Sequence, residues 1–398
     1  MAKFYKVDLS QKMQIATLMA TVAVVGANGL LLGPVLGDVA ASLDTVPASI
    51  AWAMSAYGAG TTLSALFLAP QIDRSGERKA LLLGMVVLFV AFVASAAAGH
   101  ILMLSIAQFC AGLAAGLVLP ASYGMATQLA EPGKESVMLG RVLAGWSLSL
   151  VGGVPMAAFI ADHLHWRMTY CLLTVCVSLV WLLVRRFPST HHRQTGSRVS
   201  VRSVIRIQGV LPILAIALVY TSSFYGVYAF IAPEIQRTLA VSTSRAGLVV
   251  LAFGLGFATA AFAARFLDRW QARLLFPVIL LANAAVYALM ASAIGSLTGI
   301  LSLALFWGFV NHLCLNSIVL LLTRVSPAAR GSLLGLNSAT TYLGLTLGTA
   351  AAGRVYPAAG FSVLSSSAAL LHVLAIGIFV VAWKPAGKSP GKPQKGQH

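Results

Sequence analysis

Most of the side chains that could do chemistry in this sequence are uncharged. Tyr220, Phe224 and Tyr228 recur every four residues, which places them on one face of a helix, and Asn311 and His312 lie in another long apolar run. Hydroxyls, amides and aromatic rings of this kind can hold a neutral or amphipathic ligand through apolar area and a few hydrogen bonds. His312 and His372 are the groups inside apolar runs that could titrate near neutral pH.

The carboxylates avoid the interior of the apolar runs. All ten Asp and Glu residues lie outside a run or near its end, and Asp38, Asp162 and Glu234 are of the second kind. The runs hold no paired carboxylates, no nucleophile beside a base and no metal-ligand spacing, and the four cysteines add none. We therefore expect no enzyme, no metal and no cofactor. An exporter of organic cations, which would use a buried carboxylate, is disfavoured.

The elements that position these residues must be membrane helices. Hydrophobic residues make up 59% of the 398 positions, charged residues only 9%, and the mean hydropathy is +0.87. A run of about 20 uncharged residues can cross a bilayer as a helix. Runs 80–130 and 274–323 hold two crossings each and divide near Gly99 and Gly295. Single crossings are expected in eight further runs, 13–37, 45–72, 142–161, 168–184, 207–233, 246–264, 331–353 and 355–383. This pattern predicts twelve helices.

The charges have a strong sidedness. The net charge is +17, and if the N-terminus is cytoplasmic, 23 of the 27 Lys and Arg residues fall in cytoplasmic segments. Arg167, Arg237, Arg245 and Arg354 are the four on the other side. This asymmetry follows the positive-inside rule, so we expect both termini in the cytoplasm of a multi-pass protein of the inner or plasma membrane. It also excludes nucleic acid as the partner.

The chain divides into two halves. We expect a cytoplasmic N-terminus (1–12), a six-helix bundle (13–186), a central cytoplasmic loop (187–207), a second six-helix bundle (208–383) and a disordered tail (384–398). The loop is either a short amphipathic helix at the inner leaflet or a solvated basic linker. "YGAG" (57–60) before "IDR" (72–74) is matched by "FGLG" (253–256) before "LDR" (267–269), which indicates an internal duplication.

The stretch "IDRSGERKALLLG" (72–84) resembles the signature loop between helices 2 and 3 of the major facilitator superfamily. Asp73, Arg74, Gly76 and Arg78 stand at matching positions, whereas Ala69 and Glu77 depart from the pattern. The resemblance implies an all-α integral membrane protein with two pseudo-symmetric six-helix bundles. It also implies that Asp73 faces the N-terminus of helix 11 and acts as a cytoplasmic latch between the halves. Charges that merely stop the helices are the alternative.

Two further segments resemble the twelve-span exporters of drugs, sugars and purines, the drug:proton antiporter branch. Gly145, Gly153 and Pro155 in helix 5 stand at positions of a Gly/Pro-rich antiporter motif, and close packing at such small residues would form a pivot. Helix 11, with Asn337, is similar to the sugar and purine branch. In helix 4, Gln108 replaces the arginine that such exporters link to proton coupling.

In that architecture, helices 1, 4, 7 and 10 face a central cavity. The resemblance therefore implies a substrate cavity lined by Asn28, Tyr57, Gln108, Tyr123, Tyr220, Phe224, Tyr228, Asn311, His312 and Asn337. The candidates for carrying a proton are His312, Asp38, Asp162 and Glu234. We expect a monomer that exports a small solute across the bilayer, with protons as a possible partner. An importer or uncoupled facilitator, and a receptor that no longer transports, are the alternatives.

Overall fold

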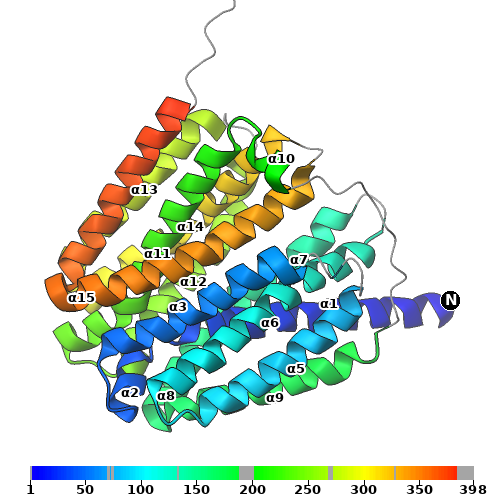
Figure 1. Ribbon diagram of the computed structural model, residues 1–398, viewed down its shortest axis with the longest axis horizontal. Helices are drawn as coiled ribbons and strands as arrows, with labels where there is room; N and C mark the ends of the chain where they lie inside the picture. The colour runs from blue at the N-terminus through cyan, green and yellow to red at the C-terminus, as the bar shows by residue number, and fades with distance from the viewer. Residues whose placement is uncertain are drawn as a thin grey trace, which may run out of the picture.

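The structure is a computed structural model that describes residues 2–69, 72, 76–131, 134–187, 201–267, 272–326 and 329–382. Within these ranges the regular elements are all helical, and most helices are long and inclined to one another in one bundle (Figure 1). The uncharged runs explain this, because in lipid each backbone N–H and C=O must be satisfied within the segment itself.

The first half runs from α1 to α9. Its elements are α1 (Ala2–Leu31), the short α2 (Leu36–Ser42), α3 (Pro47–Leu63) with the π-helical η1 (Ser64–Leu68), α5 (Glu77–Ala96), α6 (Ile101–Gln128), α7 (Glu135–Leu148) with the π-helical η3 (Ser149–Gly153), α8 (Val154–His163) and α9 (Trp166–Val184). The chain passes from α7 through η3 to α8 without a loop, so these three form one crossing over Val137–His163.

The second half follows the short α10 (Val201–Ile205). It contains α11 (Val210–Leu239), α12 (Thr243–Leu267), α13 (Ala272–Ala293), α14 (Leu297–Val325) and α15 (Arg330–Ala382). Predicted breaks are confirmed at two places, where His100 accepts from the backbone N–H of Met103 and Ser296 accepts from that of Gly299, so each caps the helix that follows.

The number of crossings agrees with the sequence prediction. Ten helices of the described chain are long and apolar enough to cross a membrane. One of them, α15, is two crossings, because Gly360 has a positive φ of 78° and turns the chain between them. The continuous segment α3–η1, residues 47–68, supplies another crossing that the ten do not include. The protein is therefore an all-helical membrane protein with twelve crossings.

Two helices end at residues other than the limits of their uncharged runs. The run that holds helix 11 ends before Arg354, but the helix continues to Gly360, because the Arg354 guanidinium lies 4.9 Å from the centre of the Trp52 ring and is accommodated there. The run 13–37 holds one crossing, but α1 ends at Leu31 and the chain turns through Gly33 and Pro34 into α2.

The internal duplication is visible in the packing. A Cβ added to Gly112 of α6 would overlap the carbonyl of Tyr57 in α3, and one added to Gly60 would overlap the carbonyl of Phe109. The second half repeats this arrangement between α12 and α14. There Gly308 lies against the carbonyl of Phe253, and Gly256 lies against that of Leu305. These glycines, two of them in the repeated "YGAG" and "FGLG" segments, let equivalent helix pairs approach equally closely in both halves.

Candidate functional site

The two halves meet at one end of the molecule, which we call the α2 end because α2 lies there (Figure 1). Two carboxylates of the first half face the beginning of α12. The Thr243 hydroxyl donates to Asp38 Oδ2 over 2.8 Å, and the backbone N–H of Ser244 donates to Asp162 Oδ2 over 3.3 Å. A helix N-terminus has unsatisfied N–H groups and a partial positive charge, so both carboxylates complement it.

Helices α3 and α15 also join the halves near this end. The Ser55 hydroxyl donates to the carbonyl of Thr346 over 2.8 Å, and Arg354 lies over Trp52. A Cβ added to Gly353 would lie 3.3 Å from that of Ala51. The Gln236 amide adds a bond of 3.3 Å to the carbonyl of Pro34. These contacts between the halves all lie between the α2 end and the middle of the helices.

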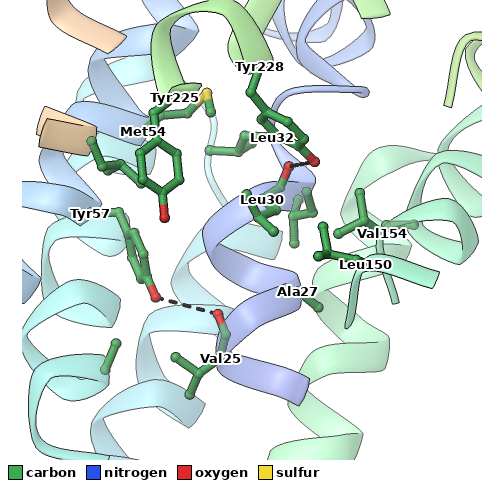
Figure 2. Packing of buried hydrophobic residues seen from close by; sticks show 14 of the residues in the cluster. Val25, Ala27, Leu30, Leu32, Met54, Tyr57, Leu150, Val154, Tyr225 and Tyr228 are labelled. Carbon is green, nitrogen blue, oxygen red and sulfur yellow. Dashed lines mark hydrogen bonds between the residues drawn. The ribbon is translucent and has the colours of Figure 1, made fainter. Parts of the chain in front are cut away.

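In the middle of the molecule, tyrosines of both halves converge on α1 (Figure 2). The Tyr228 hydroxyl of α11 donates to the carbonyl of Leu30 over 3.1 Å, and the Tyr57 hydroxyl of α3 lies 3.5 Å from that of Val25. Figure 2 shows the ring of Tyr225 on the same side of α1, with its hydroxyl directed toward Tyr57. Three tyrosines from α3 and α11 therefore gather along one side of α1.

Two tyrosine hydroxyls at this meeting point have no hydrogen-bond partner among the described residues. They belong to Tyr225 and Tyr342, both of which are 8% exposed. Tyr342 lies near Tyr57, Tyr123 and Tyr225, so tyrosines of four helices, α3, α6, α11 and α15, gather in this part of the molecule. A phenol in an apolar place usually finds a partner, so these two hydroxyls are available to a ligand. Neither Tyr225 nor Tyr342 is among the cavity residues predicted from the sequence.

An aromatic cluster lies beside the tyrosines in the second half. Phe224 is at its centre, with ring centroids 5.6 Å from Tyr228, 5.4 Å from Phe253 and 5.4 Å from Trp307. Of the predicted cavity residues, the structure thus brings Phe224 and Tyr228 together. They form an apolar wall next to the uncharged hydroxyls.

Gln108 and Asn28 lie in a polar network inside the first half. The Asn28 amide donates to Gln108 Oε1 over 3.2 Å, and Gln108 Nε2 lies within donating distance of Ser95, Tyr170 and Asn28, at 3.1, 3.0 and 3.5 Å. The side chain of Gln108 is fully buried. The network joins α1, α5, α6 and α9, and Gln108 uses its amide on these neighbours.

The remaining predicted cavity residues have different partners. Tyr123 accepts a bond of 2.9 Å from the Trp146 indole, and Tyr220 donates to Asn311 Oδ1 over 2.6 Å. Three buried polar atoms of the predicted cavity residues have no partner among the described residues, and these three are in the second half. They are Asn311 Nδ2, His312 Nδ1 and Asn337 Oδ1. The His312 ring packs edge-on against Phe257 at 4.5 Å between centroids.

The predicted gating residues are described in part. Asp73 and Arg74 lie outside the described residues, and with them the predicted cytoplasmic latch. Gly76 precedes α5 with a φ of 83°, a conformation that favours glycine. Arg78 donates to the carbonyl of Arg185 over 2.6 Å and so ties the beginning of α5 to the end of α9.

The helix 5 motif packs against α1. A Cβ on Gly145 would overlap the carbonyl of Met19, and one on Gly153 would lie 3.0 Å from Ala27. Pro155 lies two residues after the end of the π-helical η3. Proline lacks the N–H that an α-helix needs and clashes with the carbonyl four residues earlier, so a widened turn is the physical consequence.

The acidic candidates for proton carriage differ in their surroundings. Glu234 is paired with Arg237 on its own helix at 2.6 Å and accepts from the Tyr356 hydroxyl over 2.7 Å. Asp38 is in α2, outside the crossings. Burial raises its pKa above the ordinary value of 3.8, the charge of Asp162 raises it further, and the Thr243 hydrogen bond opposes both.

Twelve crossings in two matched halves, joined around uncharged polar side chains, define a polytopic transporter. The sequence pattern of the Major Facilitator Superfamily matches residues 18–231, and the chain belongs to that family. It is a secondary transporter, and the family is not one of enzymes.

Similar proteins extend over nearly the whole chain. The "Uncharacterized MFS-type transporter YwfA" of Bacillus subtilis is 26% identical over 371 residues, which cover 91% of this chain and 90% of that protein. The "Probable sugar efflux transporter" of Pasteurella multocida is 22% identical over 325 residues, 81% of this chain and 80% of that protein.

Two solved structures share the fold. A bacterial homolog of the human lysosomal transporter Spinster has a TM-score of 0.73 at 15% identity and covers 95% of this chain and 99% of its own. The human organic anion transporter MFSD10 has a TM-score of 0.70 at 15% identity and covers 93% and 99%.

Proposed function

We propose that this transporter exports a small neutral or amphipathic solute, of a drug, sugar or nucleoside kind, by alternating access. The meeting point of Tyr57, Tyr123, Tyr225 and Tyr342 carries the proposal, because it offers hydroxyls and aromatic faces from both halves and no charged group. A solute held there contacts both halves at once. Its passage therefore depends on which end of the molecule is closed.

The sidedness of the charges supports export. With most Lys and Arg residues in the cytoplasm, the α2 end faces outward and both termini face inward. The contacts of Asp38 and Asp162 with the start of α12 then close the outer end, and solute enters from the cytoplasm. The relative of Pasteurella multocida, whose name assigns it to sugar efflux, favours the same direction and a hydroxylated solute.

Transport by the purified protein in liposomes tests the proposal. Counterflow with labelled sugars and nucleosides is expected to identify at least one solute that exchanges. Tyr225→Phe and Tyr342→Phe, which remove only a hydroxyl, are expected to raise its KM about fivefold to tenfold each, the effect of one lost hydrogen bond. Tyr287→Phe is the control, because Tyr287 bonds Trp307 in the interior of the second half. An unchanged KM in both test variants would remove the tyrosine site.

An uncoupled facilitator or an importer is the second candidate. It is favoured by Gln108, which stands where related exporters carry an arginine and whose amide is bound to Asn28, Ser95 and Tyr170. Transport with and without an imposed pH gradient separates the candidates. Accumulation against the solute gradient that requires the pH gradient supports the coupled exporter. Equilibration alone, at the same rate in both conditions, supports the facilitator.

A further inference from the structure

Helices α5 and α9 lie side by side along one flank of the molecule (Figure 1). Both have exposed apolar side chains. On α9, Val175 is 55%, Leu179 57% and Leu182 49% exposed. On α5, the exposed residues Leu83, Val86, Val90 and Val93 have the same spacing of three and four residues. This spacing keeps each set on one face of its helix, so the flank is a continuous apolar surface that lipid chains cover.

Both apolar faces end in basic residues at the same end of the molecule. Lys79 comes four residues before Leu83, and Arg185 comes three residues after Leu182, so each continues the face of its helix. Arg186 follows, and all three side chains are exposed. The bond of 2.6 Å from Arg78 to the carbonyl of Arg185 holds the two ends together.

An open cavity lies at this end of α9. It has a volume of about 320 Å³ and is lined by Leu182, Arg185 and Arg186. The Arg185 guanidinium lies 4.7 Å from the centre of the Trp181 ring, which fixes its position, and the buried Trp181 indole N–H has no partner among the described residues. The nearest acidic side chain of α5, Glu77, is directed toward Gly124 of α6, away from this flank.

We propose that this α5–α9 flank binds one anionic phospholipid, with its phosphate at Arg185 and Arg186 and an acyl chain along Leu182 and Leu179. Guanidinium groups bind phosphate oxygens through paired hydrogen bonds, and the apolar face below them suits a chain rather than water. A soluble phosphate would use the arginines alone. A zwitterionic lipid would bring a cationic group to a cavity whose described lining holds no acidic residue.

The binding test uses the full-length protein in detergent. Native mass spectrometry would count lipids retained after addition of phosphatidylglycerol or phosphatidylcholine. The proposal expects one phosphatidylglycerol to bind more tightly than phosphatidylcholine. In Arg185→Gln with Arg186→Gln this preference is expected to fall, by roughly fivefold for each arginine removed. Lys134→Gln with Arg141→Gln is the matched control, because it removes two exposed basic residues of the first half outside the flank.

The outcomes separate the possible ligands. Equal binding of both lipids by the native protein would overturn the proposal, as would equal loss of phosphatidylglycerol in the test and control variants. Displacement by millimolar inorganic phosphate would identify a soluble anion as the ligand. If the glutamine variant is not recovered, Arg185→Lys with Arg186→Lys keeps both charges and is expected to retain the preference. The result does not depend on which solute is transported.

Discussion

At the scale of single residues, the clearest arrangement is the amide pair of Asn28 and Gln108. Both side chains are buried, at 2% and 0% exposure, in an interior where an unpaired amide costs free energy. Gln108 contacts Ser95 and Tyr170 as well, so it satisfies polar atoms of three other helices. Gln108, at the position where the resemblance to exporters implies an arginine, therefore links four helices through its side chain.

Replacing the first of the two amides should lower the free energy of unfolding more than replacing the second amide once the first is gone. We expect Gln108→Leu to lower the free energy of unfolding by about 1–2 kcal/mol, because Asn28 and Tyr170 lose a buried partner. The double variant with Asn28→Leu should cost less than the sum of the two single variants. Thermal unfolding in detergent measures both quantities. Additive costs would show that the two amides do not support each other.

The protonation of Asp38 makes the closing of the α2 end depend on pH. Its raised pKa means that the closed arrangement binds the proton more tightly than an open one, in which the carboxylate is hydrated. Protonation of Asp38 therefore favours the closed α2 end, and this contribution is lost as the pH rises through the raised pKa. The titratable groups around it are Asp162, His165 and His163, the last lying 4.0 Å from Asp162.

Spin labels at Ala41 and Arg245, one in each half, would report the distance across the α2 end. The contribution of Asp38 is expected to raise the ratio of closed to open molecules between neutral pH and about pH 4, by at most about tenfold for each unit of pKa shift. Asp38→Asn should remove this dependence, because the amide still accepts from Thr243 and does not titrate. Asp44→Asn, an exposed residue of the same end, should leave it intact. An unchanged pH profile in Asp38→Asn would assign the dependence to another group.

At the scale of elements, the repeated glycine contacts explain how each half is built. Gly112 and Gly308 occupy equivalent positions, and both lie against a backbone carbonyl that cannot move without its helix. We expect Gly112→Ala and Gly308→Ala each to destabilise the protein by about 1–3 kcal/mol, the usual cost of overpacking. Gly335→Ala, where no atom lies within 4 Å of the added Cβ, should be neutral or slightly stabilising. Melting temperatures of the three variants in one detergent test this, and an equal effect in all three would contradict it.

The positions of most helices could be predicted from the sequence, because a segment that crosses lipid must be almost free of charge. The absence of charge located the helices, and caps at His100 and Ser296 were expected as breaks. The rule failed at Arg354, since a charge can stay on a helix when an aromatic ring such as Trp52 lies beside it. The contacts between the halves could not be predicted from the local sequence. Thr243 and Asp38 are 205 residues apart, and only their polar types hinted at a partner.

At the scale of the whole molecule, the contacts are distributed unequally along the bundle. Hydrogen bonds of Asp38, Asp162, Gln236 and Ser55 join the halves at or near the α2 end. The meeting tyrosines lie deeper in the bundle, so a solute bound to them would leave through the α2 end only when the contacts at that end break. If the transporter works by alternating access, a covalent link between the halves at that end must stop transport.

Ala51→Cys with Gly353→Cys supplies such a link. The Cβ separation of 3.3 Å is close to that of a disulfide, and the two positions belong to α3 and α15 of opposite halves. In a background in which the four native cysteines are replaced, oxidation is expected to abolish exchange almost completely, and a reductant to restore it. Each single-cysteine variant, oxidised in the same way, should keep its activity, which excludes damage by the oxidant. Full exchange by the cross-linked protein would show that α3 and α15 stay together during transport, and that the halves separate elsewhere or not at all.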